Sequence, residues 1–298
     1  MGPPPGSAAP RLYAMIATSA PLAVVFRRGP TDWWQVCRWN LDSGELEPGA
    51  WFHGTLYPRR CDLSPDGQFL YYFALKGAPG DGTSQLAVGA TPGGATAVRS
   101  RAPRLSGTYS AVSKAPWLSA LAAWAEMGTW GRGYHFAAGR DRANVKLDIG
   151  SLSKLPFALR VTAVVQYAVE RRRGWSEDES CPPRAPDDAW DERREAVLAK
   201  VRPGGGGRLV LTDHGWDPER AIEGRHPSYR LEGGRYPGEL DGVVWADWDH
   251  RGRLLVATAD GRLEVRALGG RAITVEVAHD LAPLAPDPAP APDWATRW

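Results

Sequence analysis

The feature that most constrains the fold is a short apolar segment that occurs twice in the chain. Cys61 to Ala74 reads CDLSPDGQFLYYFA, and Asp247 to Thr258 reads DWDHRGRLLVAT. In each copy an aspartate lies five residues before a glycine, and an apolar run follows the glycine. These positions are Asp62 and Gly67 in the first copy and Asp247 and Gly252 in the second. Two copies of one pattern predict a repeat architecture.

The first copy contains a tight turn followed by a strand that is apolar on both faces. Pro65 fixes φ for a type I turn, Asp66 suits the next position, and Gly67 supplies the positive φ that closes the turn. In the run from Gln68 to Phe73, alternate side chains point to opposite faces, and both faces are apolar. Such a strand must be covered on each side. Sheets stacked around a common axis provide this cover, because each sheet lies between two neighbours.

The second copy belongs to a complete set of four predicted strands. Asp260 and Gly261 form a two-residue hairpin signal, and Gly269 and Gly270 mark the next turn. Four antiparallel strands this close together in sequence are typical of one propeller blade. The predicted strands are Val243 to Trp248, Arg253 to Ala259, Arg262 to Leu268 and Ala272 to Ala278.

We therefore predict an all-β fold, a single β-propeller of four-stranded antiparallel blades. Gly207 and Gly252 are 45 residues apart, and Gly67 and Gly252 are 185 residues apart. A period of about 45 residues fits into the longer interval about four times, which favours five blades. The first predicted blade contains residues 12–18, 22–28, 34–41 and 45–52, and the second contains 60–73, 85–88 and 96–99. The third contains 109–113, 118–124, 134–138 and 144–148, although residues 118–127 also suit a helix by propensity. The fourth contains 158–170, 208–212 and 229–232.

Changes in composition divide the chain into an arm, a propeller and a tail. Residues 1–10 are expected to form an arm without regular structure, 11–280 the propeller, and 281–298 a mobile tail rich in proline and alanine. The fourth blade carries a charged insertion over residues 171–206. Within this insertion, the spacing of apolar residues predicts a short helix over 188–201.

The repeated segment resembles a known family of repeats. The element from Asp62 to Tyr72, with its Ser-Pro-Asp-Gly turn, resembles the repeats of TolB-type and WD-repeat-like β-propellers. The whole chain also resembles bacterial single-domain proteins of this type. The resemblance covers about a dozen residues, with a second copy at Asp247 to Thr258. It implies a propeller fold and a protein-binding role, and no catalytic residue, because the shared motif is a turn.

Charge, cysteines and tryptophans narrow the range of partners. The 36 basic and 34 acidic residues leave a formal net charge of +2, which gives the chain no general attraction for nucleic acid. Three widely spaced cysteines are typical of a reducing cytoplasm.

The apolar stretch from Leu12 to Phe26 is interrupted by Pro21, so we expect two strands there and neither a secretory signal nor a membrane span. Fourteen tryptophans indicate core packing, or alternatively exposed indoles that stack on sugars.

Motifs for chemistry are lacking in the sequence. There is no nucleophile elbow and no phosphate-binding loop, so we predict no catalytic residue and no cofactor. The nearest approach to a metal site is Asp213 and His214 with Asp217, Glu219 and His226. Their spacing matches no known ligand set, so we predict no metal.

The leading hypothesis is a non-catalytic, cytoplasmic and monomeric propeller that binds a protein partner through residues 171–206 and the loop of Trp216. One alternative is a glycan-binding or glycan-cleaving propeller, in which acids would converge at the axis. A third is nucleic-acid binding through Arg171 to Arg173, although a solvated insertion is the expected state of this charge run. The candidate binding residues are Arg171, Arg172, Arg173, Trp175, Trp190, His214 and Trp216.

Overall fold

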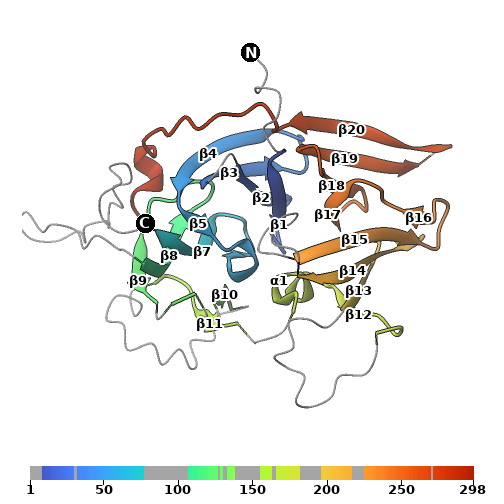
Figure 1. Ribbon diagram of the computed structural model, residues 1–298, viewed down its shortest axis with the longest axis horizontal. Coiled ribbons are helices and arrows are strands. Elements are labelled where there is room, and N and C mark those ends of the chain that lie inside the picture. The colour runs from blue at the N-terminus through green and yellow to red at the C-terminus, as the bar shows by residue number, and fades with distance from the viewer. Residues whose placement is uncertain are drawn as a thin grey trace, which may run out of the picture.

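The computed structural model describes residues 9–29, 32–76, 107–126, 128–129, 133–137, 155–162, 166–181, 196–216, 225–269 and 271–298. Over these residues the fold is all-β, with a ring of four antiparallel sheets in a propeller arrangement and one additional strand pair (Figure 1). The described residues contain one short α-helix, α1 (Ala168–Arg172). In this part of the chain, no helix has the length and hydrophobicity needed to cross a membrane.

The first sheet confirms the four strands predicted for the first blade. It runs β1-β2-β3-β4 in chain order, and each strand is antiparallel to the next. The Asn40 side chain accepts hydrogen bonds from the backbone of Asp42 and Ser43, which closes the loop between the last two strands. The strands are β1 (Arg11–Ile16), β2 (Leu22–Arg28), β3 (Trp33–Asn40) and β4 (Leu46–His53).

The second sheet contains the strand on which the fold prediction was based. β7 (Phe69–Lys76) is covered on both faces, because every side chain from Leu70 to Ala74 is fully buried. It pairs along its whole length with β8 (Gly107–Lys114), which pairs in turn with β9 (Ala122–Ala125). The sheet also includes β5 (Thr55–Leu56) and β6 (Asp62–Leu63), on either side of the 3₁₀ turn η1 (Pro58–Arg60).

This pairing corrects the assignment of strands to the second and third blades. Residues 109–113 and 118–124 were predicted in the third blade, but β8 and β9 belong to the sheet of β7. The prediction assumed that strands adjacent in sequence are adjacent in the sheet. A long connection between paired strands is tolerated because the entropy of loop closure grows slowly with loop length. The strands predicted at 85–88, 96–99 and 144–148 lie outside the described residues.

The strand predicted over 158–170 is wrong beyond its first few residues. β11 (Leu159–Val161) pairs with β10 (Tyr134–Phe136), and helix α1 then begins after Tyr167. Tyr167, which precedes α1, has φ 58, a left-handed conformation that a strand does not accommodate. Here tertiary contacts made by α1, described below, override the strand propensity of the sequence.

The third sheet corrects the predicted helix over 188–201. Val197 to Val201 form strand β13, which pairs in full register with the following strand, so the helix is wrong over these residues. Residues 182–195 lie outside the described residues. A short apolar run suits a helix or a strand, and the available pairing partner decides between them. The strands are β12 (Ser176–Glu177), β13 (Val197–Val201), β14 (Arg208–Trp216), β15 (Arg225–Glu232) and β16 (Gly238–Glu239).

The fourth sheet confirms the complete blade predicted around the second copy of the repeat. Its four strands run in chain order, with Gly261 at positive φ in the hairpin between the second and third. Burial is deepest in the second strand, where Leu254 to Ala257 are fully buried. The strands are β17 (Val243–Trp248), β18 (Leu254–Thr258), β19 (Arg262–Gly269) and β20 (Ala272–Asp280).

The two repeated turns occupy equivalent positions in the ring. Gly67 and Gly252 have φ 74 and 72, as the turn chemistry predicts. Each turn rests on the first long hairpin of the preceding sheet. The amide of Ser19 donates to Pro65 O at 2.8 Å, and Arg202 Nε donates to Gly252 O at 2.7 Å. The repeat therefore encodes a contact between neighbouring sheets as well as a turn.

The last segment of the chain packs along the first and second sheets (Figure 1). Arg27, only 2% exposed, donates to Leu281 O at 2.7 Å and to Leu284 O at 2.6 Å. The ring of Trp298 lies 6.1 Å from that of Phe69. Between these contacts lies a short turn, η5 (Asp293–Ala295), whose Ala295 is fully buried.

Candidate functional site

Helix α1 lies toward the middle of the ring, beside β1 (Figure 1). Tyr13 on β1 donates its hydroxyl to Glu170 at 3.2 Å. Arg173, which ends the helix, donates from Nε to Ile16 O at 2.7 Å and from a terminal nitrogen to Asp62 on β6 at 2.9 Å. One short segment thus links the first and second sheets through polar contacts in the interior.

The same segment reaches the fourth sheet through Trp175. This side chain is 3% exposed, and its indole donates to the Asp247 carboxylate on β17 at 3.4 Å. The other oxygen of Asp247 accepts from Lys200 Nζ on β13 at 2.6 Å. The side chains of Arg173 and Trp175 are therefore buried, whereas Arg171 and Arg172 are partly exposed and Gly174 is exposed. The solvated charge run expected from the sequence does not extend to Arg173 and Trp175, because buried carboxylates and a backbone carbonyl bind them.

The two recurring aspartates have equivalent roles. Asp62 and Asp247 are each 4% exposed, and each accepts from a cation of a different element. Asp62 also accepts from the backbone amide of Phe136 at 2.9 Å. A buried carboxylate needs such partners, because removing its charge from water without them is costly. The repeat therefore places a counter-ion at the inner strand of two sheets.

A second ion pair anchors the base of α1. Arg59 and Glu170 lie 2.5 Å apart, and the guanidinium of Arg59 lies over the rings of Tyr13 and Tyr167. Burial lowers the pKa of Arg59, but Glu170 together with Tyr167, Tyr13 and Tyr229 outweighs this effect, so the pKa is raised overall. Burial raises the pKa of Tyr13, and the charge of Glu170 adds to the increase. Both side chains therefore keep their ordinary protonation states near neutral pH.

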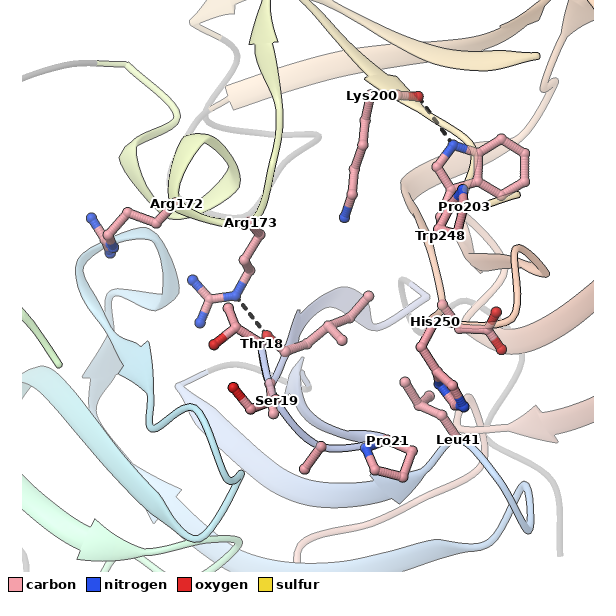
Figure 2. A pocket seen from close by; sticks show the side chains of 14 residues that line it. Thr18, Ser19, Pro21, Leu41, Arg172, Arg173, Lys200, Pro203, Trp248 and His250 are labelled. Atoms are coloured by element: carbon pink, nitrogen blue, oxygen red, sulfur yellow. Dashed lines mark hydrogen bonds between the residues drawn. The ribbon is translucent and has the colours of Figure 1, made fainter. Parts of the chain in front are cut away.

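A pocket of about 590 Å³ opens beside this network (Figure 2). It lies between the β1–β2 hairpin, the end of α1, the end of β13 and the β17–β18 turn. Three basic residues belong to its lining, Arg172 and Arg173 at the end of α1 and Lys200 on another side, and the side chain of Arg172 is directed away from the open space. Figure 2 shows the ammonium group of Lys200 pointing into the open space between α1 and the β17–β18 turn. The remaining wall is largely apolar and includes Ile16, Pro21, Leu41, Pro203 and Trp248.

The basic residues of this pocket differ in how many ion pairs and hydrogen bonds they make. Arg172 lies 3.7 Å from Asp62, and its buried Nε has no hydrogen-bond partner among the described residues. Burial lowers the pKa of Arg172, and Asp62 opposes this effect. The positive charge of Arg172 also acts on His135, whose pKa is lowered first by burial and then by this charge.

The pocket also contains one carboxylate. Asp249 is 1% exposed and lies 2.7 Å from Arg253, with which it forms an ion pair inside the β17–β18 turn. Arg253 also donates to the backbone carbonyl of Leu41, which joins the fourth sheet to the first. The charge of Asp249 is therefore balanced within the turn.

The structure brings together two of the predicted binding residues, Arg172 and Arg173, at the pocket. Arg171 instead pairs with Glu177 at 2.8 Å, and His214 is exposed and bonded to the Ser228 hydroxyl at 2.8 Å. Trp190 and the side chain of Trp216 lie outside the described residues.

Sequence reasoning named only Arg172 and Arg173 among the residues that line the pocket, and Lys200, Trp248 and His250 are among those it missed. Lys200 was placed in the predicted helix, and the other two were interpreted only as part of the repeat. The repeated aspartate was the available signal, because a buried carboxylate requires a cation nearby.

The acidic and histidine residues near Asp213 do not form a metal site in the part of the chain that the structure describes. Among the described residues, no group of three or more histidine, cysteine, aspartate or glutamate side chains is placed to hold a metal ion. Asp213 is fully buried and pairs with Arg225 at 2.8 Å. Asp217 and Glu219 lie outside the described residues.

No protein-family model matches the chain, and a search of curated protein sequences finds no relative. The structure shows a propeller arrangement of small antiparallel sheets, and the comparisons identify no family.

Proposed function

We propose that the protein is a non-catalytic propeller that binds a protein partner at the face that carries the pocket. The observation that carries this proposal is the pocket itself, whose lining combines basic residues with apolar ones. Binding surfaces on rigid scaffolds are commonly formed by loops, and here the rim consists of the β1–β2 hairpin and the β17–β18 turn. Of the binding region predicted over 171–206, the proposal therefore keeps Arg172, Arg173 and Lys200, which line the pocket.

The state of the nearby acids supports binding over catalysis. A general base must be free to accept a proton from a substrate. Asp62, Asp247 and Asp249 each accept from a cation at 2.9 Å or less. Asp62 and Asp247 therefore hold Arg173 and Lys200 in place, and Asp249 holds Arg253 within the β17–β18 turn.

A blocking substitution at the rim tests the proposal. Ser19 is exposed and lines the pocket, so Ser19→Trp would fill the entrance without removing a core contact. Thr274→Trp on the exposed strand β20 is the matched control, because Thr274 is exposed and does not belong to the pocket lining among the described residues. Affinity capture from an extract of the cells that express the protein should recover a partner with the wild type and with Thr274→Trp, and lose it with Ser19→Trp. Recovery of the same partner with both variants would refute the proposal.

We also infer a fifth blade at the position of β10 and β11. Phe136 on β10 bonds to Asp62 on the inner strand of the second sheet, and α1 follows β11 in the chain. This order supports a position for the pair between the second and third sheets. A five-bladed propeller related to the TolB-type or WD-repeat-like families accounts for this order and for the repeated turn.

A monomer in a reducing cytoplasm is part of the same proposal. Cys37, Cys61 and Cys181 are not in disulfide bonds, and the first two are buried. Burial raises the pKa of Cys37 to about 12, so this thiol stays protonated and unreactive. Sedimentation of the purified chain under reducing conditions should give a single species of 32.4 kDa.

The alternatives receive less support from the described residues. Arg172 and Arg173 are directed toward Asp62, and Arg171 toward Glu177, so the arginine cluster is not a free surface for nucleic acid. For glycan binding, indoles would have to be exposed in a row. Six of the described tryptophans are instead almost completely buried: Trp34, Trp39, Trp124, Trp175, Trp245 and Trp248.

A further inference from the structure

A second, smaller cavity lies between the third and fourth sheets. Its volume is about 210 Å³, and Trp248 lines both this cavity and the pocket described above. Three arginines belong to its lining: Arg202 from the β13–β14 loop, Arg208 at the start of β14 and Arg235 from the β15–β16 loop. Two neighbouring hairpins therefore contribute basic residues to one small cavity.

The charge of Arg208 is balanced by carboxylates. Arg208 pairs with Asp178 at 2.7 Å and with Glu232 at 2.5 Å. Glu232 also pairs with Arg230 at 2.7 Å. Hydrogen bonds from Arg230 and Arg208 lower the pKa of Glu232, so this carboxyl group is ionised near neutral pH. Two arginines and two carboxylates thus cancel beside the cavity.

Arg202 has no carboxylate partner in the part of the chain that the structure describes. Its Nε donates to Gly252 O at 2.7 Å, and its guanidinium carbon lies 5.7 Å from the centre of the Trp248 ring. One terminal nitrogen lies 3.9 Å from the position that a Cβ on Gly206, another residue of the lining, would take. The guanidinium is therefore held at the cavity with its terminal nitrogens available to a ligand.

Arg235 is the second arginine that no described carboxylate balances. It is exposed, and its guanidinium carbon lies 6.0 Å from the centre of the ring of Tyr236, which lines the same cavity. Once the two balanced arginines are set aside, two positive charges remain. The cavity therefore favours an anion that carries two negative charges.

The shape of the cavity limits that anion to a small group. A water molecule takes about 30 Å³ of liquid volume, so the cavity has the volume of about seven water molecules. Gly206, Gly207 and Gly233 also line it, and without side chains they allow an oxyanion to approach the backbone. A phosphate monoester carries about 1.5 to 2 negative charges near pH 7, and its oxygens match the fork of a guanidinium.

We propose that this cavity binds a phosphate monoester, with Arg202 and Arg235 as the groups that bind its oxygens. A carboxylate or a phosphodiester would balance only one of the two charges. The phosphate is either free inorganic phosphate or a phosphorylated side chain of a partner, and the chemistry of recognition is the same. The inference goes beyond the proposed function, because this cavity is not the pocket at which the partner is proposed to bind.

The first test compares ligands that differ in charge. Methyl phosphate is largely a dianion at about pH 8, whereas dimethyl phosphate and acetate are monoanions. Binding is measured by calorimetry and by the ³¹P NMR signals of the two phosphates. We expect saturable binding of methyl phosphate and at least tenfold weaker binding of dimethyl phosphate and acetate. Equal binding of methyl phosphate and either monoanion would overturn the proposal.

Substitutions assign the effect to the two arginines. Arg202→Gln and Arg235→Gln should each weaken methyl phosphate binding about tenfold or more, because each removes charge-assisted hydrogen bonds. The control Arg262→Gln removes the same charge at a side chain 54% exposed on β19 and should leave the affinity unchanged. Arg202→Gln also loses the bond to Gly252 O, so the exposed Arg235→Gln keeps the test valid if Arg202→Gln fails to fold. Equal affinities of Arg235→Gln and Arg262→Gln would refute the assignment.

A peptide arm separates the two sources of the phosphate. An acetylated, amidated tripeptide with a central phosphoserine is compared with the same peptide containing serine and with inorganic phosphate. Tighter binding of the phosphopeptide than of inorganic phosphate identifies a partner's side chain as the source, and the reverse order identifies free phosphate. Equal binding of the phosphorylated and unphosphorylated peptides would contradict phosphate recognition. The capture experiment with Ser19→Trp tests the other pocket, so either proposal can fail without the other.

Discussion

The buried pair of Asp62 and Arg173 should contribute strongly to the stability of the ring. The side chains are 6% and 5% exposed and lie 2.9 Å apart. Asp62→Asn removes the negative charge, and the amide oxygen can still accept from the backbone of Phe136. The main consequence is a buried guanidinium without its counter-ion.

The magnitude follows from the remaining contacts of Arg173. Removing one partner of a buried ion pair typically costs about 3–5 kcal/mol. Arg173 keeps Ile16 O at 2.7 Å and Val169 O at 3.1 Å, so the loss should lie near the lower limit, about 3 kcal/mol. This is a large fraction of the roughly 5–15 kcal/mol by which folded domains are stable.

Urea unfolding followed by tryptophan fluorescence and far-UV circular dichroism measures this loss. With an m-value of about 3 kcal/mol per molar, the midpoint should fall by about 1 M. The control is Asp42→Asn, which removes an exposed pair with Arg251 at 2.5 Å and should change stability by less than about 1 kcal/mol. Equal, small shifts in Asp62→Asn and Asp42→Asn would refute the reasoning.

Three further predictions concern packing, the repeated turn and pH. Gly49→Ala places a Cβ 2.5 Å from Pro116 O and should lower the free energy of unfolding by about 1–3 kcal/mol. In the control Gly269→Ala the new Cβ meets nothing within 4 Å, so this variant should be tolerated. Equal thermal midpoints of the two variants would contradict the prediction. Gly252→Ala combines φ +72 with a Cβ 2.6 Å from Pro203 O, and should lower the thermal midpoint more than Gly269→Ala does. Burial and then Arg172 lower the pKa of His135, so the folded protein favours the neutral ring while the unfolded chain binds a proton near pH 6.5. Stability should therefore fall as the pH drops from 7.5 to 5.5, and His135→Asn should lose part of this dependence; identical pH profiles would contradict the assignment.

The parts of the fold that were predictable from sequence are those in which neighbouring strands pair in chain order. In the first and fourth sheets, short turns such as Asp260-Gly261 fix the pairing locally, so the alternation of apolar residues is sufficient. Gly67 and Gly252 were identifiable because only a few residue types suit their backbone conformation.

The errors arose where distant residues decide the structure. β8 follows β7 in the sheet although about thirty residues separate them in sequence, and β13 is a strand because β14 is available to pair with it. The segment from Arg171 to Trp175 is highly charged and was interpreted as solvated. The burial of its Arg173 and Trp175 side chains depends on Asp62 and Asp247, which lie far from it in the chain. No local pattern contains that information.

Hydrogen exchange of the Trp175 indole tests whether the side chain that follows α1 is buried between the sheets. The indole N–H of Trp175 is buried and bonded to Asp247, whereas Trp298 is 51% exposed. We expect the Trp175 signal to exchange as slowly as the amides of Leu254 to Ala257, which are fully buried in β18. Exchange as fast as that of the Trp298 indole would place Trp175 in solvent and contradict this arrangement.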